Sequence, residues 1–393
     1  MKNKKIILGI TGGIAAYKSC YLIRYLVKAG AEVKVVATES GLKFVGEVTL
    51  RTLSNNNVYF DMFSEWNEKA HEHISITDWG DIFIVAPATA NIIGKLANGI
   101  ADDVLSTSLL AFDKQMLIAP AMNTKMYNNP AVQRNMEFLA STGVEFINPD
   151  TGDLACGYEG KGRMAEPEHI FRESKYYLNR TNELSGKKIV VTASRTEESL
   201  DPVRYLTNRS SGITGFKIAE QAAMMGAETI LITGPTDQEI FSKVKRINVI
   251  SAEDMFKAVD KEFDSCDCLI MSAAVADYTF EVSPTKIKKT DDKLEFSAKR
   301  TKDILYEMGQ KKNSQVIVGF AMETNDAVEN AKKKLSKKNA DFIVLNSISE
   351  ENPAFGSNEN KISIVTQGNV EEFPAMDKEE IANIILDKAF RKP

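Results

Sequence analysis

Short apolar runs alternate along the chain with longer segments in which apolar residues recur at helical spacing. In the first half the apolar runs are Ile6–Ile10, Val33–Ala37, Ile82–Ala86 and Met116–Ala119. The segment Ile14–Ala29 follows the first run, and its apolar residues mark one face of a helix. Nearly continuous apolar runs suit strands buried on both faces of a parallel sheet, with helices as the crossover connections. The pattern predicts a doubly wound α/β domain.

A glycine-rich stretch without periodicity, Asn148–Arg163, interrupts this alternation, and we expect a surface loop there. Residues 168–184 have a helical pattern. The alternation then restarts, and the strands expected in the second half are Ile189–Ala193, Thr229–Thr233, Leu269–Ala273, Val316–Phe320 and Phe342–Leu345. No repeat at a fixed period relates the two halves. We therefore predict two doubly wound, Rossmann-like domains that differ in detail, residues 1–183 and residues 184–393.

Composition narrows the class of protein. The 393 residues suit two or three domains, and a net charge of −5 gives no broad cationic field for nucleic acid or an anionic membrane. Four cysteines without a CxxC pair do not make a disulfide framework, and three histidines in the first half exclude a Cys2His2 zinc site. The lysine-rich start continues as strand, turn and helix rather than as a secretory signal. We expect a cytoplasmic protein with reduced thiols.

Polar and glycine-rich segments follow several of the predicted strands in the first half. Gly9–Gly13 (GITGG) is either a phosphate-binding turn or a plain strand-to-helix turn, and it lacks the GxGxxG fingerprint of nicotinamide domains. Ala86–Asn91 (APATAN) and Pro120–Met126 (PAMNTKM) place hydroxyl and amide groups after two further strands. Ligands of open α/β sheets bind at that carboxyl edge, so both segments are candidate ligand contacts. Met122 and Met126 equally suit a core.

Two other features carry candidate chemistry. His71 and His73 lie in HEHIS, where a pair of solvated loop histidines is the simplest interpretation and the spacing suits a strand face more than a helical metal pair. Cys156 lies in the glycine-rich stretch. A structural thiol is normally buried, so a cysteine in a surface loop suggests reactivity.

Taken together, these segments carry a resemblance. GITGGIAAYK, the segment at His73, PATAN, PAMNTKM and ACGYEGKGRM stand in the order and at the spacings of flavin-dependent cysteine decarboxylases, which the first half resembles. The resemblance implies a flavodoxin-like domain with FMN as its cofactor. It further implies that His73 is the active-site base, Asn123 holds the substrate carboxylate and Cys156 donates the last proton. The implied FMN contacts are Gly12, Thr38, Thr89 and Ser106.

This implied chemistry has a clear reason. A β-thiol carboxylate does not readily lose CO2, because the carbanion left behind has no electron sink. Oxidation of the thiol to a thioaldehyde by FMN supplies that sink, and the enethiolate left after CO2 loss is then protonated and reduced. A neutral amide suits the carboxylate, because a buried cation would stabilise the ground state and oppose CO2 loss.

The second half offers a different set of polar segments. Asn208–Gly215 (NRSSGITG) precedes a predicted helix and is either a phosphate cradle or an ordinary cap. Asp277 follows a strand in AAVADY, where it can contact a base, a ribose or Mg2+. The basic runs Lys286–Lys289 and Lys332–Lys338 are either solvated faces or neutralise a triphosphate, and Lys334 and Lys338 share one helix face.

With DPVRY, NRSSG, AAVADY, KIKK and VGFAMET, the second half resembles phosphopantothenate–cysteine ligases, and the whole chain resembles the bifunctional coenzyme A biosynthesis family. That family activates 4′-phosphopantothenate with CTP as an acyl-cytidylate, which L-cysteine attacks. The resemblance implies that Asn208 contacts the acyl-cytidylate and that Lys286 binds the nucleotide and assists catalysis. The other implied CTP contacts are Asp277, Phe320, Lys334 and Lys338. Mg2+ is expected with CTP, possible ligands including Asp277.

The second half also departs from the family pattern at two places. Where the family reads TAGPTRE, this chain has Thr192–Glu198 as TASRTEE. Where the family has Pro-Asp-Ile, this chain has Lys302-Asp303-Ile304. These changes concern the approach of a phosphate and a nucleotide contact, respectively.

The sequence leaves two alternative functions open. One is a flavoprotein of the decarboxylase family whose ligase half is degenerate. The other is a nicotinamide-dependent reductase, which the missing fingerprint disfavours. For the leading interpretation we expect small-molecule substrates, no nucleic acid or membrane partner, and a homo-oligomer with trimeric decarboxylase units and dimeric ligase units, as the family implies.

Overall fold

The computed structural model describes residues 1–61, 72–153, 159–288, 296–323, 326–347 and 359–390. The chain divides into two compact units, unit 1 over Met1–Asn179 and unit 2 over Arg180–Pro393. The predicted boundary was four residues further on. Thr181 donates a backbone hydrogen bond to Met224 and Leu184 donates one to Met225, so residues 181–184 pair with the end of a helix in unit 2. This pairing also explains why the helix predicted over 168–184 ends at Asn179.

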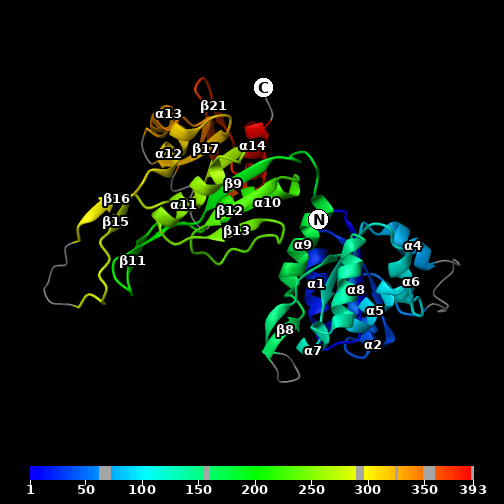
Figure 1. The fold of residues 1–393 in the computed structure, drawn as a ribbon. Coiled ribbons are helices and arrows are strands. Elements are labelled where there is room, and N and C mark those ends of the chain that lie inside the picture. The colour runs from blue at the N-terminus through cyan, green and yellow to red at the C-terminus, as the bar shows by residue number, and fades with distance from the viewer. Residues whose placement is uncertain (62–71, 154–158, 289–295, 324–325, 348–358, 391–393) are drawn as a thin grey trace. The chain divides into compact units, whose positions relative to one another are not determined.

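Unit 1 is built on a parallel six-stranded sheet in the order β3-β2-β1-β4-β5-β6 (Figure 1). The strands are β1 (Lys5–Ile10), β2 (Glu32–Ala37), β3 (Val58–Tyr59), β4 (Ile82–Ala88), β5 (Gln115–Pro120) and β6 (Glu145–Phe146). The helices are α1 (Ala16–Lys28), α2 (Glu39–Leu42), α3 (Glu47–Ser54), α4 (Glu72–Trp79), α5 (Ala90–Ala97), α6 (Val104–Ala111), α7 (Thr124–Tyr127), α8 (Pro130–Ser141) and α9 (Pro167–Asn179). The doubly wound prediction is confirmed, with the Rossmann strand order rather than the 2-1-3-4-5 order of flavodoxin.

The sheet of unit 1 is covered on both faces, which explains its uninterrupted apolar runs. Ile6, Leu8 and Ile10 of β1 pack in one cluster with α1 and α9. Ile7, on the other face of the same strand, packs with Phe83 and with residues of α6 and α8. Successive side chains of a strand point to opposite faces, so a strand between two helical layers must be apolar at every position.

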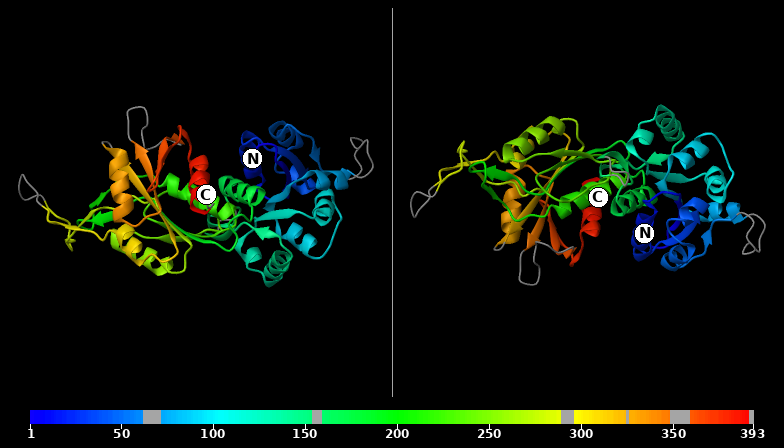
Figure 2. Two further views of the ribbon diagram at one scale, coloured as in Figure 1. Left: turned by 90° about the horizontal axis from the view of Figure 1, so that it is seen from above. Right: turned by 90° about the horizontal axis from the view of Figure 1, so that it is seen from below.

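Unit 2 repeats this strand order and extends it. Its sheet runs β13-β12-β9-β14-β17-β18-β20-β21, in which β20 is antiparallel to β18 and β21 is antiparallel to β20. The strands are β9 (Lys188–Ala193), β12 (Glu228–Thr233), β13 (Lys245–Asn248), β14 (Cys268–Met271), β17 (Val316–Glu323), β18 (Phe342–Ser347), β20 (Ile362–Val365) and β21 (Val370–Glu372). The helices are α10 (Ile213–Met224), α11 (Ala252–Phe263), α12 (Ile304–Lys311), α13 (Ala327–Lys337) and α14 (Lys378–Phe390). Helices α10 and α14 lie side by side (Figures 1 and 2).

Two-stranded ribbons complete unit 2. They pair β10 (Glu197–Ser199) with β11 (Tyr205–Thr207), β15 (Tyr278–Phe280) with β16 (Ala298–Arg300), and β19 (Glu359–Asn360) with β22 (Met376–Asp377). The first two ribbons contact each other and extend beyond the sheet (Figure 2). Across the described ranges, no helix combines the length and apolar character needed to span a bilayer.

The glycine-rich stretch is not the irregular loop that its composition predicts. It contains the antiparallel strands β7 (Asp150–Asp153) and β8 (Glu159–Arg163). Its glycines allow close backbone packing, because a Cβ at Gly162 would lie 2.3 Å from the carbonyl oxygen of Met122 and one at Gly160 would lie 2.4 Å from Thr124 Oγ1. Met122 N–H in turn donates to the Gly162 carbonyl at 3.0 Å. The strand is fixed by backbone contacts, so it leaves no apolar period in the sequence.

Candidate functional site

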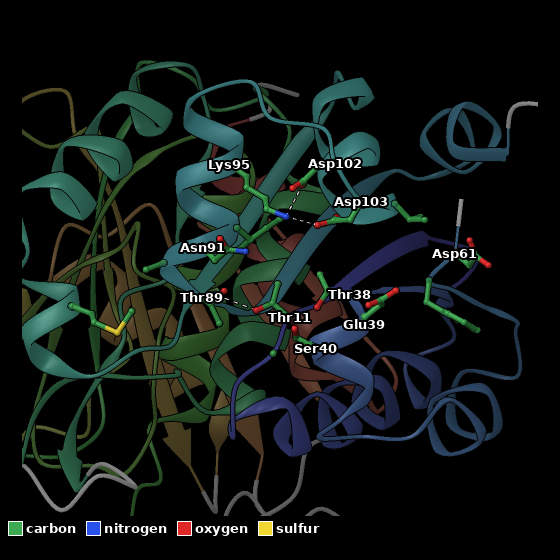
Figure 3. A pocket seen from close by; sticks show the side chains of 16 residues that line it. Thr11, Thr38, Glu39, Ser40, Asp61, Thr89, Asn91, Lys95, Asp102 and Asp103 are labelled. Carbon is green, nitrogen blue, oxygen red and sulfur yellow. Dashed lines mark hydrogen bonds and ion pairs between the residues drawn. The ribbon is translucent and has the colours of Figure 1, made fainter. Parts of the chain in front are cut away.

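A cavity of about 730 Å³ lies at the carboxyl edge of the unit 1 sheet (Figure 3). Gly12 follows β1, Thr38 follows β2 and Thr89 follows β4, and all three line it. Strands β1 and β4 are adjacent in the sheet, and the strand order changes direction between them. Open α/β sheets bind ligands at such a switch point. Three of the four predicted FMN contacts are therefore brought together.

Local contacts hold the floor of this cavity. Thr11 Oγ1 donates to the Pro87 carbonyl at 2.8 Å and accepts from Thr89 N–H at 3.2 Å, which ties the turn after β1 to the turn after β4 (Figure 3). A Cβ at Gly12 would lie 2.5 Å from Ser40 Cβ. The GITGG turn thus needs glycine for close approach of the segment after β2, whether or not a phosphate binds there.

Donors at the turns after β2 and β4 suit a phosphorylated ligand, although Glu39, Asp61, Asp102 and Asp103 also line the cavity. Thr89 is the N-cap of α5, its side chain makes no capping bond, and the residue lines the cavity together with the first residues of that helix. Thr38 Oγ1 accepts from Gly41 N–H at 3.1 Å and so caps α2. Hydroxyls and helix amino termini are the donors that bind a phosphate monoester.

Ser106, the fourth predicted FMN contact, is fully buried and does not line the cavity. It forms a capping box with Asp103: Ser106 N–H donates to Asp103 Oδ1 at 2.8 Å, and Asp103 N–H donates to Ser106 Oγ at 3.1 Å. The structure thus gives Ser106 a role in fixing the start of α6. Asp102 and Asp103 of the same turn do line the cavity.

A charged cluster that was not predicted from the sequence lies at this wall. Lys95 Nζ lies 2.6 Å from Asp102 Oδ1 and 2.7 Å from Asp103 Oδ2 (Figure 3). Burial disfavours the charged amine, but the hydrogen bonds to the two carboxylates outweigh it and raise the pKa of Lys95. The hydrogen bond that Lys95 donates lowers the pKa of Asp102. In the sequence, the consecutive acidic residues after Ala101 were the feature that could have indicated this cluster.

A second cavity, of about 540 Å³, adjoins the first and shares Gly12, Thr89 and Met126 with it. Asn123 lines this second cavity. Its Oδ1 accepts from Met126 N–H at 2.8 Å and caps α7, an orientation that leaves the amide nitrogen as the donor for a ligand. Met126 is 44% exposed, so it is not the core residue that its spacing with Met122 allowed.

The strand β8 borders the same cavity through Gly162 and Arg163. Residues 154–158, which include Cys156, fall outside the described residues, as does His71. His73 belongs to helix α4, whereas its spacing with His71 favoured a strand face. The side chain of His73 is not described, so the roles predicted for His73 and Cys156 remain predictions.

In unit 2 one predicted residue, Asn208, contacts the segment that follows β14. Arg195 pairs with Ala274 in a parallel bridge just beyond β9 and β14. Asn208 Nδ2 donates to the carbonyls of Ala274 at 3.2 Å and Val275 at 3.3 Å. The NRSSG and AAVADY segments therefore meet at the switch point of the second sheet, which corresponds to the cavity position in unit 1.

A buried carboxylate connects the DPVRY and KIKK segments. Asp201 Oδ2 accepts from Arg204 Nη1 at 2.6 Å and from Ile287 N–H at 3.1 Å. Burial tends to raise the pKa of Asp201, but the backbone N–H groups of Val203, Ile287 and Arg204, together with the guanidinium, lower it to about 2. Lys286 is exposed and precedes the residue that Asp201 holds. Asp201 was missed as a site residue, although it opens a motif that the sequence analysis singled out.

The remaining predicted nucleotide contacts make internal contacts. Lys334 Nζ donates to the Phe320 carbonyl at 2.7 Å. Lys338 forms an ion pair with Asp303, and its Nζ lies 5.4 Å from the centre of the Tyr306 ring. The Asp277 carbonyl accepts from Thr301 N–H at 3.0 Å, and the residue is exposed. Within the described ranges, no group of three or more His, Cys, Asp or Glu side chains is arranged to hold a metal ion.

Comparison with known proteins assigns both halves to families. The flavoprotein family model matches residues 1–178, and the model for the DNA/pantothenate metabolism flavoprotein C-terminal domain matches residues 184–391. The coenzyme A biosynthesis bifunctional protein CoaBC of Bacillus subtilis is 47% identical over 99% of this chain and 97% of that protein. Its counterpart in Haemophilus influenzae is 40% identical over 100% of this chain and 98% of that protein.

Two further proteins are similar to the chain. A cysteine/cysteine sulfinic acid decarboxylase from an unknown prokaryotic organism is 42% identical over 87% of this chain and 97% of that protein. The crystal structure of the C-terminal domain of a coenzyme A biosynthesis bifunctional protein CoaBC is 38% identical, covers 53% of this chain and 96% of that chain, and has a TM-score of 0.46.

Proposed function

The chain belongs to the family of bifunctional coenzyme A biosynthesis proteins, and we propose that its two activities are divided between residues 1–183 and residues 184–393. The protein is an enzyme with phosphopantothenoylcysteine decarboxylase and phosphopantothenate–cysteine ligase activities. Its first half is a flavoprotein domain. The ligase product is the decarboxylase substrate, so the halves catalyse consecutive steps.

For the decarboxylase half, the observation that carries the proposal is the pair of adjoining cavities. The larger one offers hydroxyls and helix amino termini to the phosphate of FMN, through Gly12, Thr38 and Thr89. The smaller one holds Asn123 beside residues shared with the larger. A carboxylate bound at Asn123 therefore lies next to the cofactor position.

FMN held there would supply a reversible two-electron acceptor for the substrate thiol, so that the overall decarboxylation would be redox-neutral. The protein residues position the substrate and transfer protons to and from it. Asn123 orients the carboxylate through a neutral amide, which does not oppose CO2 loss. His73 removes the thiol proton, and Cys156 protonates the enethiolate carbon.

For the ligase half, we propose that CTP and 4′-phosphopantothenate bind at the ends of β9 and β14. The contact of Asn208 with Ala274 and Val275 supports this position. Lys286 stabilises charge on the α-phosphate as the carboxylate oxygen attacks and pyrophosphate leaves. The cysteine amine then attacks the acyl carbon and cytidine monophosphate leaves. Lys334 and Lys338 exchange their present hydrogen-bond partners for the nucleotide. Phe320 packs beside the nucleotide and Asp277 contacts it. Mg2+, if bound with CTP, would offset the negative charge of the phosphates.

Purified protein tests the decarboxylase half directly. Flavin absorbance should co-purify with the chain, and mass spectrometry should detect phosphopantetheine from 4′-phosphopantothenoylcysteine. Because one relative is a cysteine/cysteine sulfinic acid decarboxylase, free L-cysteine should be offered in parallel. If CO2 is released from free cysteine but not from 4′-phosphopantothenoylcysteine, the proposed substrate is wrong.

Pyrophosphate release tests the ligase half. With 4′-phosphopantothenate, L-cysteine and Mg2+, CTP should support release and ATP should not. Equal rates with the two nucleotides would reject CTP specificity. No release with either would favour a degenerate ligase half attached to an active decarboxylase.

A further inference from the structure

The segment after β9 holds an arginine at a sharp and crowded turn. Ser194 adopts a left-handed backbone conformation, with φ of 66°, and its Oγ donates to the Pro235 carbonyl at 2.8 Å. A Cβ at Gly234 would lie 1.7 Å from the carbonyl oxygen of Arg195. One at Gly212 would lie 3.0 Å from Ser194 Cα. The backbone at Ser194 and Arg195 is therefore packed tightly between the segments that contain these glycines.

The side chain of Arg195 reaches the NRSSG segment. Its Nη1 donates to the Ser210 carbonyl at 2.8 Å. Its Nε lies 4.0 Å from Glu197 Oε1, and the Arg195 side chain is 30% exposed. Ser210 stands two residues after Asn208 and two before Gly212, the N-cap of α10. The guanidinium thus fixes the middle of the segment whose first residue contacts Ala274 and Val275.

We propose that Arg195 is the positioning residue of the ligase site, holding Ser210 so that Asn208 and the start of α10 face the substrate. A second effect follows from charge, since the guanidinium offsets the carboxylate of Glu197 beside a site for anionic substrates. This inference rests on the proposed ligase function. Arg195 itself need not touch the substrate.

The segment around Arg195 departs from the family pattern. Aligned with TAGPTRE, the arginine of the family pattern falls on Glu197, and the Gly-Pro pair falls on Ser194 and Arg195. Residues two apart in an extended segment point to the same side. Arg195 Nε lies 4.0 Å from Glu197 Oε1, so the two side chains are neighbours, and we expect a guanidinium introduced at residue 197 to reach the same space.

This arrangement predicts that the arginine can be exchanged between the two positions. Arg195→Gln should lower kcat/KM for ligation by about tenfold or more, as expected for a lost charge-assisted hydrogen bond. The double variant Arg195→Gln with Glu197→Arg should recover most of that loss. Decarboxylation by the same chains is the internal reference and should not change. Hydrogen exchange of residues 208–212 should be faster in Arg195→Gln and slow again in the exchanged variant.

A charge-only control separates positioning from neutralisation. Arg195→Gln with Glu197→Gln removes the carboxylate without restoring a guanidinium, and it should stay impaired. Recovery in this variant would overturn positioning, as would unchanged ligation in Arg195→Gln. If the wild-type chain does not ligate at all, the proposed function fails. Hydrogen exchange then still tests whether Arg195 holds Ser210. Unchanged exchange at residues 208–212 in Arg195→Gln would overturn that contact's positioning role.

Discussion

Lys18 Nζ lies 2.8 Å from Glu166 Oε1 and so joins helix α1 to the segment that follows β8. The same oxygen accepts from Arg163 Nη2 at 2.7 Å, and Lys18 Nζ also donates to the Met164 carbonyl at 3.2 Å. The side chain of Lys18 is 7% exposed. These contacts anchor the base of the β7–β8 hairpin beside the cavity that holds Asn123.

Glu166→Gln should destabilise unit 1, because it leaves the buried ammonium of Lys18 without its carboxylate. The expected loss is about 1–3 kcal/mol, reduced from that of a fully buried pair by the exposure of Glu166. Urea unfolding followed by tryptophan fluorescence measures it selectively, since Trp66 and Trp79 both belong to unit 1. Glu47→Gln, at an exposed pair with Arg51, is the matched control and should have little effect.

The Glu166 effect should also depend on pH. The hydrogen bond from Lys18 lowers the pKa of Glu166 below its ordinary value of 4.5. A depressed pKa means that the stabilisation is complete above that ordinary value and is lost as the pH falls through the folded-state pKa. The difference between wild type and Glu166→Gln should therefore shrink in acid. A difference that stays constant into strong acid would contradict the ion pair.

Asn123→Ser should abolish decarboxylation while leaving ligation intact. A serine still caps α7, so the local fold is retained, but it lacks the amide proposed to orient the carboxylate. Release of CO2 and ligation of cysteine are measured on one preparation. Asn129→Ser makes the same change at the N-cap of α8 and should preserve both activities. Normal CO2 release by Asn123→Ser would remove Asn123 from the mechanism.

Cys156→Ser should still release CO2 but should accumulate a product two hydrogens lighter than phosphopantetheine. The hydroxyl has a far higher pKa than the thiol and protonates the enethiolate poorly. Mass spectrometry of the product, with flavin absorbance followed alongside, should show that product together with reduced flavin. Cys20→Ser is the control and should give the normal product. Wild-type yields of phosphopantetheine from Cys156→Ser would argue against a late proton transfer by this thiol.

Lys286→Gln should impair ligation with CTP while the protein stays yellow and able to decarboxylate. The variant removes a cation from the segment that Asp201 holds through Ile287. Steady-state ligation rates at varied CTP measure the loss. Lys257→Gln removes the same charge from an exposed position on α11 and should ligate normally. Normal ligation by Lys286→Gln would contradict the role assigned to KIKK.

Asp201→Asn should destabilise unit 2 and weaken ligation, because an amide cannot accept all the N–H donors that meet this carboxylate. The pKa of Asp201 is about 2, below the ordinary value of 3.8. Its stabilisation is therefore complete above the ordinary value and is lost as the pH falls toward about 2. Circular dichroism follows the unfolding transition that tryptophan fluorescence does not report. A stability difference between wild type and Asp201→Asn that grows in acid would refute the lowered pKa of Asp201.

Much of the fold follows from local pattern. The apolar runs Ile6–Ile10 and Ile189–Ala193 correspond to the central strands β1 and β9 because burial on both faces leaves a continuous apolar signal. The β7–β8 hairpin gave no such signal, since Gly160 packs against the Thr124 side chain and Gly162 against the backbone of Met122 rather than against an apolar core. The unit division at Asn179 was also inaccessible, because it depends on Thr181 pairing with Met224 across a distance in sequence.

The sequence by itself determined the class of fold, the family and the segments that carry chemistry. Those properties reside in residue order, which local spacing preserves. Only the tertiary structure decided that Ser106 is buried in a capping box while Gly12, Thr38 and Thr89 share a cavity. It alone paired Arg195 with Ser210 and Asp201 with Ile287. The physical reason is that hydrogen bonds and ion pairs depend on distance in space, and the sheet brings together residues that lie far apart along the chain.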